Sequence, residues 1–240
     1  MVSKLMSCSF DTICGAGPNG AIIHYRVTEE TDRPVRQGEL LLVDSGGQYV
    51  DGTTDITRTI AIGDPGDEAR EAYTRVLQGM VAISRVRFPK GISGRDIDAL
   101  ARYPLWLAGQ DYDHGTGHGV GAFLSVHEGP QRISRLSEVP LEPGMILSNE
   151  PGYYREGAFG IRLENLIVVE PAPALGDNRQ QLAFETLTWV PFDRRLILVQ
   201  RLSPGERDWL NLYHDSVLKR LSERVSGATL QWLRAACAPI

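Results

Sequence analysis

Two stretches of the chain place apolar residues at the spacing of one helix face. The first follows Asp64-Pro65-Gly66-Asp67, and its apolar positions are Ala69, Ala72, Tyr73, Val76, Leu77, Met80 and Ile83. The second follows the capping-box sequence Ser203-Pro204-Gly205-Glu206, and it carries Trp209, Leu210, Tyr213, Val217 and Leu221. A further helix is expected from Ser93 to about Leu107, with Pro104 disturbing its last turns. We expect the first helix to pack its apolar stripe on a sheet.

Shorter runs between these helices have the composition of strands. Residues 12–25 read as two strands around a glycine-rich turn, and residues 39–43 and 48–62 read as a β-hairpin. Further short strands are expected around His118, His127 and Glu150, and residues 161–165 read as mid-strand, with Arg162 and Glu164 on one face. The pattern predicts an α+β fold with helices on one face of a curved antiparallel sheet.

The composition limits the class of partner. With 240 residues, 42% of them hydrophobic, the chain can bury one sizeable core. A net charge of -5, without a basic stripe, argues against nucleic acid or an anionic membrane as partner. Three cysteines without metal-ligand spacing, no signal-like start and no long apolar run favour a cytoplasmic protein.

Acidic residues stand at the ends of several predicted strands, together with one histidine in the glycine-rich sequence GTGHGVG. They are Asp44, Asp55, His118, Glu150 and Glu164. Each has an ordinary interpretation alone: a turn-initiating aspartate, solvent-facing strand carboxylates, or a histidine in an exposed loop. Taken together, four carboxylates and one imidazole form the ligand set expected for two divalent cations such as Mn²⁺, Co²⁺ or Zn²⁺.

Four motifs carry a resemblance to a known family. They are LLVDSGGQYVDGTTDITRT, HGTGHGVGAFLSVHEGP, NEPGYYREGAFGIRLEN and the tail from Trp189 through WLNLYH. The chain resembles the catalytic domain of X-prolyl aminopeptidase (aminopeptidase P) of the cytosolic type, within the pita-bread metallopeptidases. This implies a pita-bread domain over residues 1–190 and a C-terminal helical tail, 191–240, that packs on or extends the same domain.

The resemblance also implies roles for individual residues. Asp55 and Glu164 would bridge two metal ions, Asp44 would chelate one of them, and His118 and Glu150 would complete the other. Glu150 would also shuttle a proton. Residues expected to act on or bind the substrate are His24, His114, His127 and Arg162, with His114 and His127 counted as catalytic. Mn²⁺ is the expected metal, peptides with proline at the second position are the expected substrates, and a homodimer is the expected assembly.

Two alternatives remain open within this resemblance: an X-Pro dipeptidase, and an inactive remnant that acts only by binding. In the family, helices and two further domains precede the segment matching Asp11. The resemblance therefore implies a chain that is N-terminally truncated relative to the family, without its opening helices. We therefore expect apolar surface to lie bare on ELLLV, on MILSN and on the helix stripe from Ala69 to Ile83, with self-association and weak activity as consequences.

Overall fold

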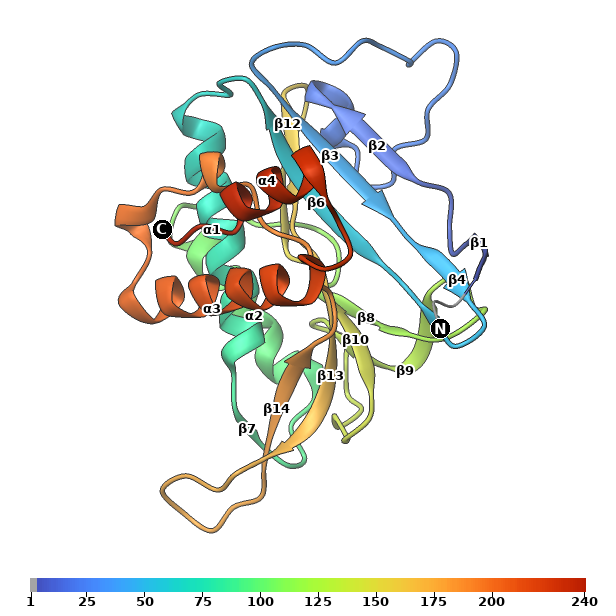
Figure 1. The fold of residues 1–240 in the computed structure, drawn as a ribbon. Coiled ribbons are helices and arrows are strands. Elements are labelled where there is room, and N and C mark those ends of the chain that lie inside the picture. The colour runs from blue at the N-terminus through green and yellow to red at the C-terminus, as the bar shows by residue number, and fades with distance from the viewer. Residues whose placement is uncertain (1–3) are drawn as a thin grey trace.

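The computed structural model describes residues 4–240, and Figure 1 shows its arrangement of strands and helices. The strands are β1 (Leu5–Cys8), β2 (Ile13–Ala16), β3 (Glu39–Ser45), β4 (Gly47–Tyr49), β5 (Gly52–Thr53), β6 (Ile56–Ile62), β7 (Phe88–Pro89), β8 (Gly117–Val120), β9 (His127–Ile133), β10 (Ile146–Asn149), β11 (Gly152–Arg155), β12 (Phe159–Arg162), β13 (Asn165–Ala172) and β14 (Gln181–Thr186). The α-helices are α1 (Asp67–Arg85), α2 (Gly94–Trp106), α3 (Pro204–Leu221) and α4 (Gly227–Ala236). Short 3-10 helices are η1 (Gly17–Ala21), η2 (Arg194–Leu196) and η3 (Val199–Arg201).

The strands form one long sheet and three smaller ones. The long sheet has the order β7-β14-β13-β10-β8-β9, and a three-stranded sheet has the order β2-β3-β6. The two remaining sheets are β11-β12 and β1-β4-β5. Every ladder between these strands is antiparallel. The predicted α+β class with an antiparallel sheet is confirmed.

The sheets meet where β6 runs beside the link between β12 and β13. The backbone N–H of Arg162 donates to Thr59 Oγ1 at 3.1 Å, and the N–H of Glu164 donates to the Thr57 carbonyl at 3.1 Å. Thr57 and Thr59 are both buried in β6. This junction brings predicted site residues from distant parts of the sequence into one place.

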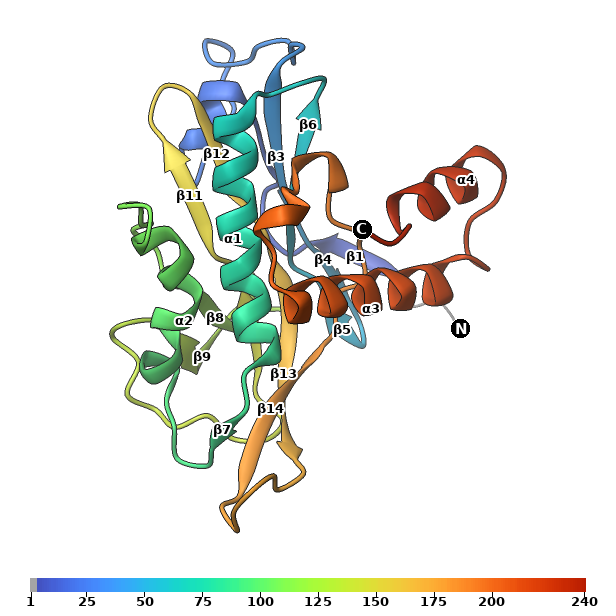
Figure 2. The same cartoon turned by 90° about the vertical axis from the view of Figure 1, so that its left-hand side faces the viewer.

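Helix α1 buries the predicted apolar stripe. All seven positions from Ala69 to Ile83 are at most 2% exposed, and six of them share a core cluster with Leu210, Tyr213 and Val217 of α3. Figure 2 shows α1 running along the strands with α3 crossing beside it. The capping box predicted at Ser203 and Glu206 is present at the start of α3. Both helix predictions are confirmed.

The segment 12–25 corrects one expectation. The first strand is present as β2, but η1 and a bend follow it in place of a second strand. Gly17 adopts a positive φ of 52°, and a proline stands in the first turn of η1. A left-handed glycine followed by proline favours a tight helical turn over an extended return strand.

Two strand predictions also need correction. The hairpin pairs β3 with β6, but residues 48–62 are divided, because β4 and β5 turn aside to pair with each other and β4 also pairs with β1. Leu163 and Glu164 lie between β12 and β13 rather than in mid-strand. Arg162 and Glu164 nevertheless both line one cavity, while Ile161 and Leu163 enter the core, as the alternation predicted.

The expected bare apolar surface is wrong for the helix stripe and for three strand residues, whereas Leu41, Val43, Met145 and Ile146 are half-buried. Leu40, Leu42 and Leu147 are at most 2% exposed, and the stripe of α1 is buried. These side chains lie in core clusters built from neighbouring strands and from α1, α2 and α3. Self-association and the domain division at residue 190 stay predictions. Among residues 4–240, no helix has both the length and the apolar character needed to cross a bilayer.

Candidate metal centre

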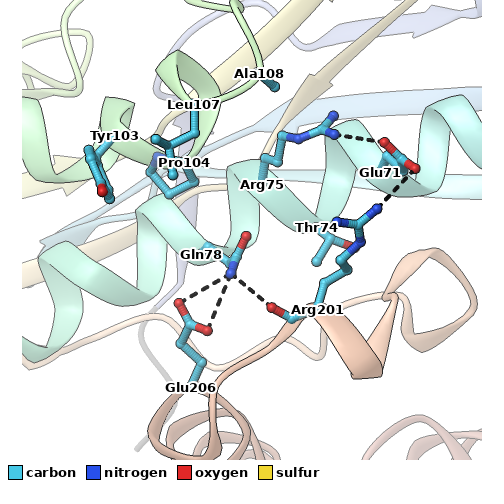
Figure 3. Close-up of a pocket in the computed structure, with 10 residues that line it drawn as sticks. All are labelled: Glu71, Thr74, Arg75, Gln78, Tyr103, Pro104, Leu107, Ala108, Arg201 and Glu206. Carbon is cyan, nitrogen blue, oxygen red and sulfur yellow. Dashed lines mark hydrogen bonds and ion pairs between the residues drawn. The ribbon is translucent and has the colours of Figure 1, made fainter.

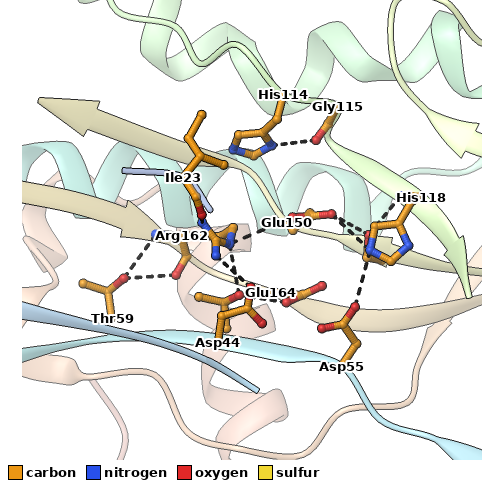
Figure 4. A network of polar contacts seen from close by, with 12 residues as sticks. Ile23, Asp44, Asp55, Thr59, His114, Gly115, His118, Glu150, Arg162 and Glu164 are labelled. Atoms are coloured by element: carbon orange, nitrogen blue, oxygen red, sulfur yellow. Dashed lines mark hydrogen bonds and ion pairs between the residues drawn. The ribbon is translucent and has the colours of Figure 1, made fainter. Parts of the chain in front are cut away.

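All nine predicted site residues line one cavity of about 470 Å³. Figure 4 shows its polar contacts. Five of the nine are the predicted metal ligands, Asp44, Asp55, His118, Glu150 and Glu164, which we call the acidic cluster. The remaining four are His24, His114, His127 and Arg162. The structure therefore gathers in one place every residue that the sequence suggested, although they are spread over 140 positions of the chain.

The ends of strands position the acidic cluster. Asp44 stands near the end of β3, and Asp55 directly precedes β6. His118 lies in β8, and Glu150 and Glu164 flank the paired strands β10 and β13. Short strands that converge from two sheets thus deliver one ligand each.

Three members of the acidic cluster form its compact part. Asp55, His118 and Glu164 each offer a ligand atom, and these atoms lie within 4.8 Å of one another. The Nε2 atom of His118 is 3.4 Å from Asp55 Oδ2 and 3.5 Å from Glu150 Oε1. Its Nδ1 atom lies 2.9 Å from the Gly119 carbonyl, which favours the tautomer with the proton on Nδ1. Nε2 is then free to ligate a metal, the usual arrangement of metal-binding histidines.

The glycines around His118 have a steric reason. A Cβ on Gly117 would overlap the carbonyl of Ser148, and a Cβ on Gly119 would overlap the carbonyl of Glu128. These carbonyls belong to β10 and β9, the two neighbours of β8 in the sheet. Glycine allows β8 to lie close between them, and this holds His118 at the cavity wall.

Asp44 keeps one carboxylate oxygen without a partner. Its Oδ2 accepts a hydrogen bond from Arg162 Nη2 at 2.7 Å, whereas the buried Oδ1 has no hydrogen-bond partner among the described residues. A buried carboxylate oxygen without a donor is costly, and a cation would satisfy it. This observation, with the oxygen-rich donor set, shows that the residues fit divalent metal ions.

The electrostatics of the cluster lead to the same conclusion. Burial and the neighbouring carboxylates raise the pKa of Glu164 well above its ordinary value. Burial raises the pKa of Glu150 to about 7, against the opposing charges of His118 and Arg162. Burial alone would lower the pKa of His118, but Asp55 and Glu150 outweigh it and raise the pKa to about 9. These shifts show that the crowded carboxylates favour added positive charge, which a divalent metal ion would supply.

Arg162 fixes the acidic cluster from one side. It is 2% exposed, and its guanidinium donates to Asp44, to Thr57 Oγ1 at 3.1 Å and to the Tyr154 hydroxyl at 2.8 Å. The sequence analysis missed Tyr154 and Thr57. Both stand inside the motifs that carry the resemblance, but nothing in their local pattern distinguishes them from neighbouring strand residues.

Three further histidines line the cavity. His114 Nε2 lies 2.9 Å from the Tyr154 hydroxyl, and its Nδ1 lies 2.8 Å from the Gly115 carbonyl. The ring of His127 is centred 4.4 Å from that of His118, and His24 is exposed at the cavity. Burial lowers the pKa of His114 to about 4, and burial and the charge of His118 lower the pKa of His127. His114 is therefore neutral at pH 7.

A second cavity, of about 440 Å³, lies between α1, α2 and the segment that leads into α3 (Figure 3). None of the predicted site residues lines it. Its polar groups contact one another: Glu71 forms ion pairs with Arg75 and Arg201, and the Gln78 amide donates to Glu206. These contacts are those of a structural interface between helices.

Comparison with known proteins identifies relatives of the whole chain. Residues 3–171 match metallopeptidase family M24, and residues 180–240 match the C-terminal region of that family. The chain is 48% identical over 239 residues to a probable Xaa-Pro aminopeptidase P of Laccaria bicolor, and 51% identical over 238 residues to aminopeptidase P2 of Arabidopsis thaliana. Each alignment covers 97% of the chain but only 37% and 34% of these relatives, so the chain spans about a third of their length.

Solved structures give the same relationship. An X-prolyl aminopeptidase from Caenorhabditis elegans, described as a cytosolic enzyme with a di-nuclear active site, matches with a TM-score of 0.94 and 40% identity over 100% of the chain and 40% of that protein. A prolidase from Pyrococcus furiosus matches with a TM-score of 0.62 and 33% identity over 68% of the chain and 47% of that protein. The sequence and structural matches together establish that the chain belongs to metallopeptidase family M24.

Proposed function

We propose that this chain carries the active site of a dinuclear metal-dependent aminopeptidase. It would release the N-terminal residue from peptides with proline at the second position. The observation that carries the proposal is the acidic cluster, in which Asp55, His118 and Glu164 converge and Asp44 keeps a buried oxygen without a donor. The relatives named Xaa-Pro aminopeptidases support the substrate class, because their similarity extends over nearly the whole chain.

Five residues would hold the two metal ions. Asp55 and Glu164 would bridge them, Asp44 would complete the ligands of one, and His118 and Glu150 would complete those of the other. When bound, two such cations supply Lewis acidity and lower the pKa of water, which removes the need for a side-chain nucleophile. Arg162 would keep Asp44 oriented through its hydrogen bond to Oδ2.

Glu150 is the residue to which we assign proton transfer. Its Oε1 accepts a hydrogen bond from the Ser148 hydroxyl at 2.9 Å, and this fixes the carboxylate plane. Its Oε2 lies 4.0 Å from Arg162 Nε, beyond hydrogen-bond distance. Oε2 is therefore the atom that can take up and return a proton beside the acidic cluster.

The three remaining histidines would bind the peptide. His127 and His24 are exposed at the cavity, so their rings can meet a substrate directly. His114 already uses both ring nitrogens, toward Gly115 and Tyr154. In this arrangement it would act on the substrate by orienting the Tyr154 hydroxyl, a narrower role than the catalytic one expected from the resemblance.

Three further assignments belong to the proposal. Mn²⁺ is the metal we assign, with Co²⁺ and Zn²⁺ as the competing ions, because carboxylate oxygens dominate the ligand set. We place the protein in the cytoplasm, in keeping with the relative described as cytosolic. The proposed assembly is a homodimer.

Metal stoichiometry on the purified, monodisperse chain is the primary test. We expect about two Mn²⁺ per chain, lost on chelation together with several degrees of thermal stability, because ligand binding stabilises the folded state. An unchanged melting temperature after exhaustive chelation of a metal-loaded sample would count against the proposal.

Substrate length separates the remaining alternatives. An X-Pro-containing tripeptide should release its first residue, whereas an X-Pro dipeptidase would cleave only the dipeptide. Full metal occupancy without hydrolysis of either peptide would support an inactive remnant instead.

A further inference from the structure

Arg58 is a buried arginine directly behind the metal centre. It lies in β6, between Thr57 and Thr59, and is 8% exposed. Its guanidinium has no carboxylate within salt-bridge distance among residues 4–240. A buried charge without an ionic partner is costly, so its neutral hydrogen-bond partners must be numerous and well placed.

Those partners come from four separate parts of the chain. Nη1 donates to the carbonyls of Thr57 and Glu164, and Nη2 donates to Asn165 Oδ1 at 2.7 Å, to the Val190 carbonyl at 2.8 Å and to the Tyr213 hydroxyl at 3.0 Å. The guanidinium carbon also lies 4.3 Å from the centre of the Phe192 ring. One planar group thus connects β6, the start of β13, the segment after β14 and helix α3.

Glu164 needs such support because it lies outside the sheet ladders. It precedes β13, whose pairing with β10 ends at Asn165 opposite Asn149. Its N–H donates to the Thr57 carbonyl, and its carboxylate accepts one protein hydrogen bond, from Thr57 Oγ1 at 2.8 Å. No N–H of a ladder partner donates to its carbonyl, which instead accepts a hydrogen bond from Arg58. Thr57 and Arg58 therefore fix both ends of this residue.

Helix α3 fixes Arg58 in turn. The Tyr213 hydroxyl lies 2.9 Å from the Val190 carbonyl and 3.0 Å from the Thr188 carbonyl, and the Val190 N–H reaches it at 3.2 Å. The Tyr213 ring packs against Phe192, with centroids 5.1 Å apart. The same hydroxyl thus secures both Arg58 and the Val190 carbonyl that Arg58 contacts.

We propose that Arg58 is a positioning residue for Glu164, and that through Arg58 the C-terminal segment from Val190 to Tyr213 forms part of the framework of the metal centre. This rests on the proposed function, since it concerns how Glu164 is presented to a metal ion. Lysine would keep the charge but not the fork of donors, so it should not replace Arg58 fully.

The test compares three variants by Mn²⁺ titration calorimetry at fixed pH and by thermal unfolding of the metal-free protein. Arg58→Lys removes hydrogen bonds that the Arg58 guanidinium donates, and Tyr213→Phe removes the hydroxyl that accepts one of them. Tyr73→Phe is the matched control, because it removes a buried hydroxyl from the same core cluster, bonded to the Asp193 N–H at 3.2 Å but not to Arg58 or Glu164.

We expect Arg58→Lys to weaken Mn²⁺ binding about 10–100-fold, the range for loss of a residue that orients a metal ligand, and Tyr213→Phe to weaken it less but measurably. Tyr73→Phe should keep the wild-type Kd within about twofold, whatever stability it loses. If Arg58→Lys fails to fold, Tyr213→Phe against Tyr73→Phe still gives the answer.

The outcomes distinguish this proposal from the proposed function. Wild-type affinity in Arg58→Lys and Tyr213→Phe would overturn the positioning role alone. Equal weakening in Tyr73→Phe would also overturn it, since the effect would then follow general stability. A wild-type protein that binds no Mn²⁺ would overturn the proposed function, and this role with it.

Discussion

His118, in the acidic cluster, and His114 line the same cavity, but their surroundings shift the imidazole pKa in opposite directions. In the cluster, carboxylates surround His118 and raise its pKa to about 9. Nearby, His114 packs among Tyr154, Tyr112 and a backbone carbonyl, and its pKa falls to about 4. Burial favours the neutral form of His114, whereas the carboxylates around His118 outweigh burial and favour its charged form, so the surroundings of each imidazole decide its charge.

The largest effect is expected from a substitution in the acidic cluster. Glu150→Gln should lower kcat about 10²–10⁴-fold, more than it changes substrate binding, because the amide cannot take up the proton. Steady-state kinetics with an X-Pro tripeptide measure both parameters. Glu128→Gln, the same charge change at an exposed position of β9, is the control and should retain wild-type kcat. A proportional fall of kcat in both variants would contradict the role given to Glu150.

The next effect separates the two neighbouring histidines. His118→Ala should weaken Mn²⁺ binding more than the roughly 10–100-fold that loss of an orienting residue costs, because a ligand atom is removed. His127→Ala should retain the metal and lose substrate affinity or turnover instead. Metal content after dialysis, together with KM and kcat, tests the pair. Comparable metal loss in both variants would overturn this division of roles.

The smallest expected effect is the contribution of His114 to the pH dependence of stability. The pKa of His114 is about 4 in the folded protein, against about 6.5 in an unfolded chain, so the unfolded state binds more protons between these values. Stability should therefore fall as pH drops below about 6.5. The groups that influence or contact this ring are Tyr112, Tyr154, Arg102, Arg162 and His24.

Urea unfolding of the chelated protein at pH 7 and pH 5 measures this contribution. His114 should account for about 2 kcal/mol of the stability lost between the two values. In His114→Asn the loss should be smaller by that amount. An equal loss in wild type and variant would show that His114 does not stay neutral on folding.

Local sequence patterns determined much of the architecture. The stripe on α1 and the capping box of α3 depend on residues within one turn of each other, so spacing alone predicted them. The same holds for the candidate residues, because strand ends and glycine-rich turns mark Asp44, His118 and Glu150 within short motifs. Their roles remain predictions.

How those residues meet depends on the packing of segments that are far apart in the sequence. This packing left Asp44 Oδ1 without a donor while Arg162 took Oδ2, and it joined Arg58 to Glu164 and Tyr213 across more than 100 residues of chain. Such contacts depend on how the sheets and α3 pack, and no local periodicity encodes a side-chain hydrogen bond between distant segments. The sequence thus marked the candidate groups, and packing decided which of their atoms are left without a protein partner.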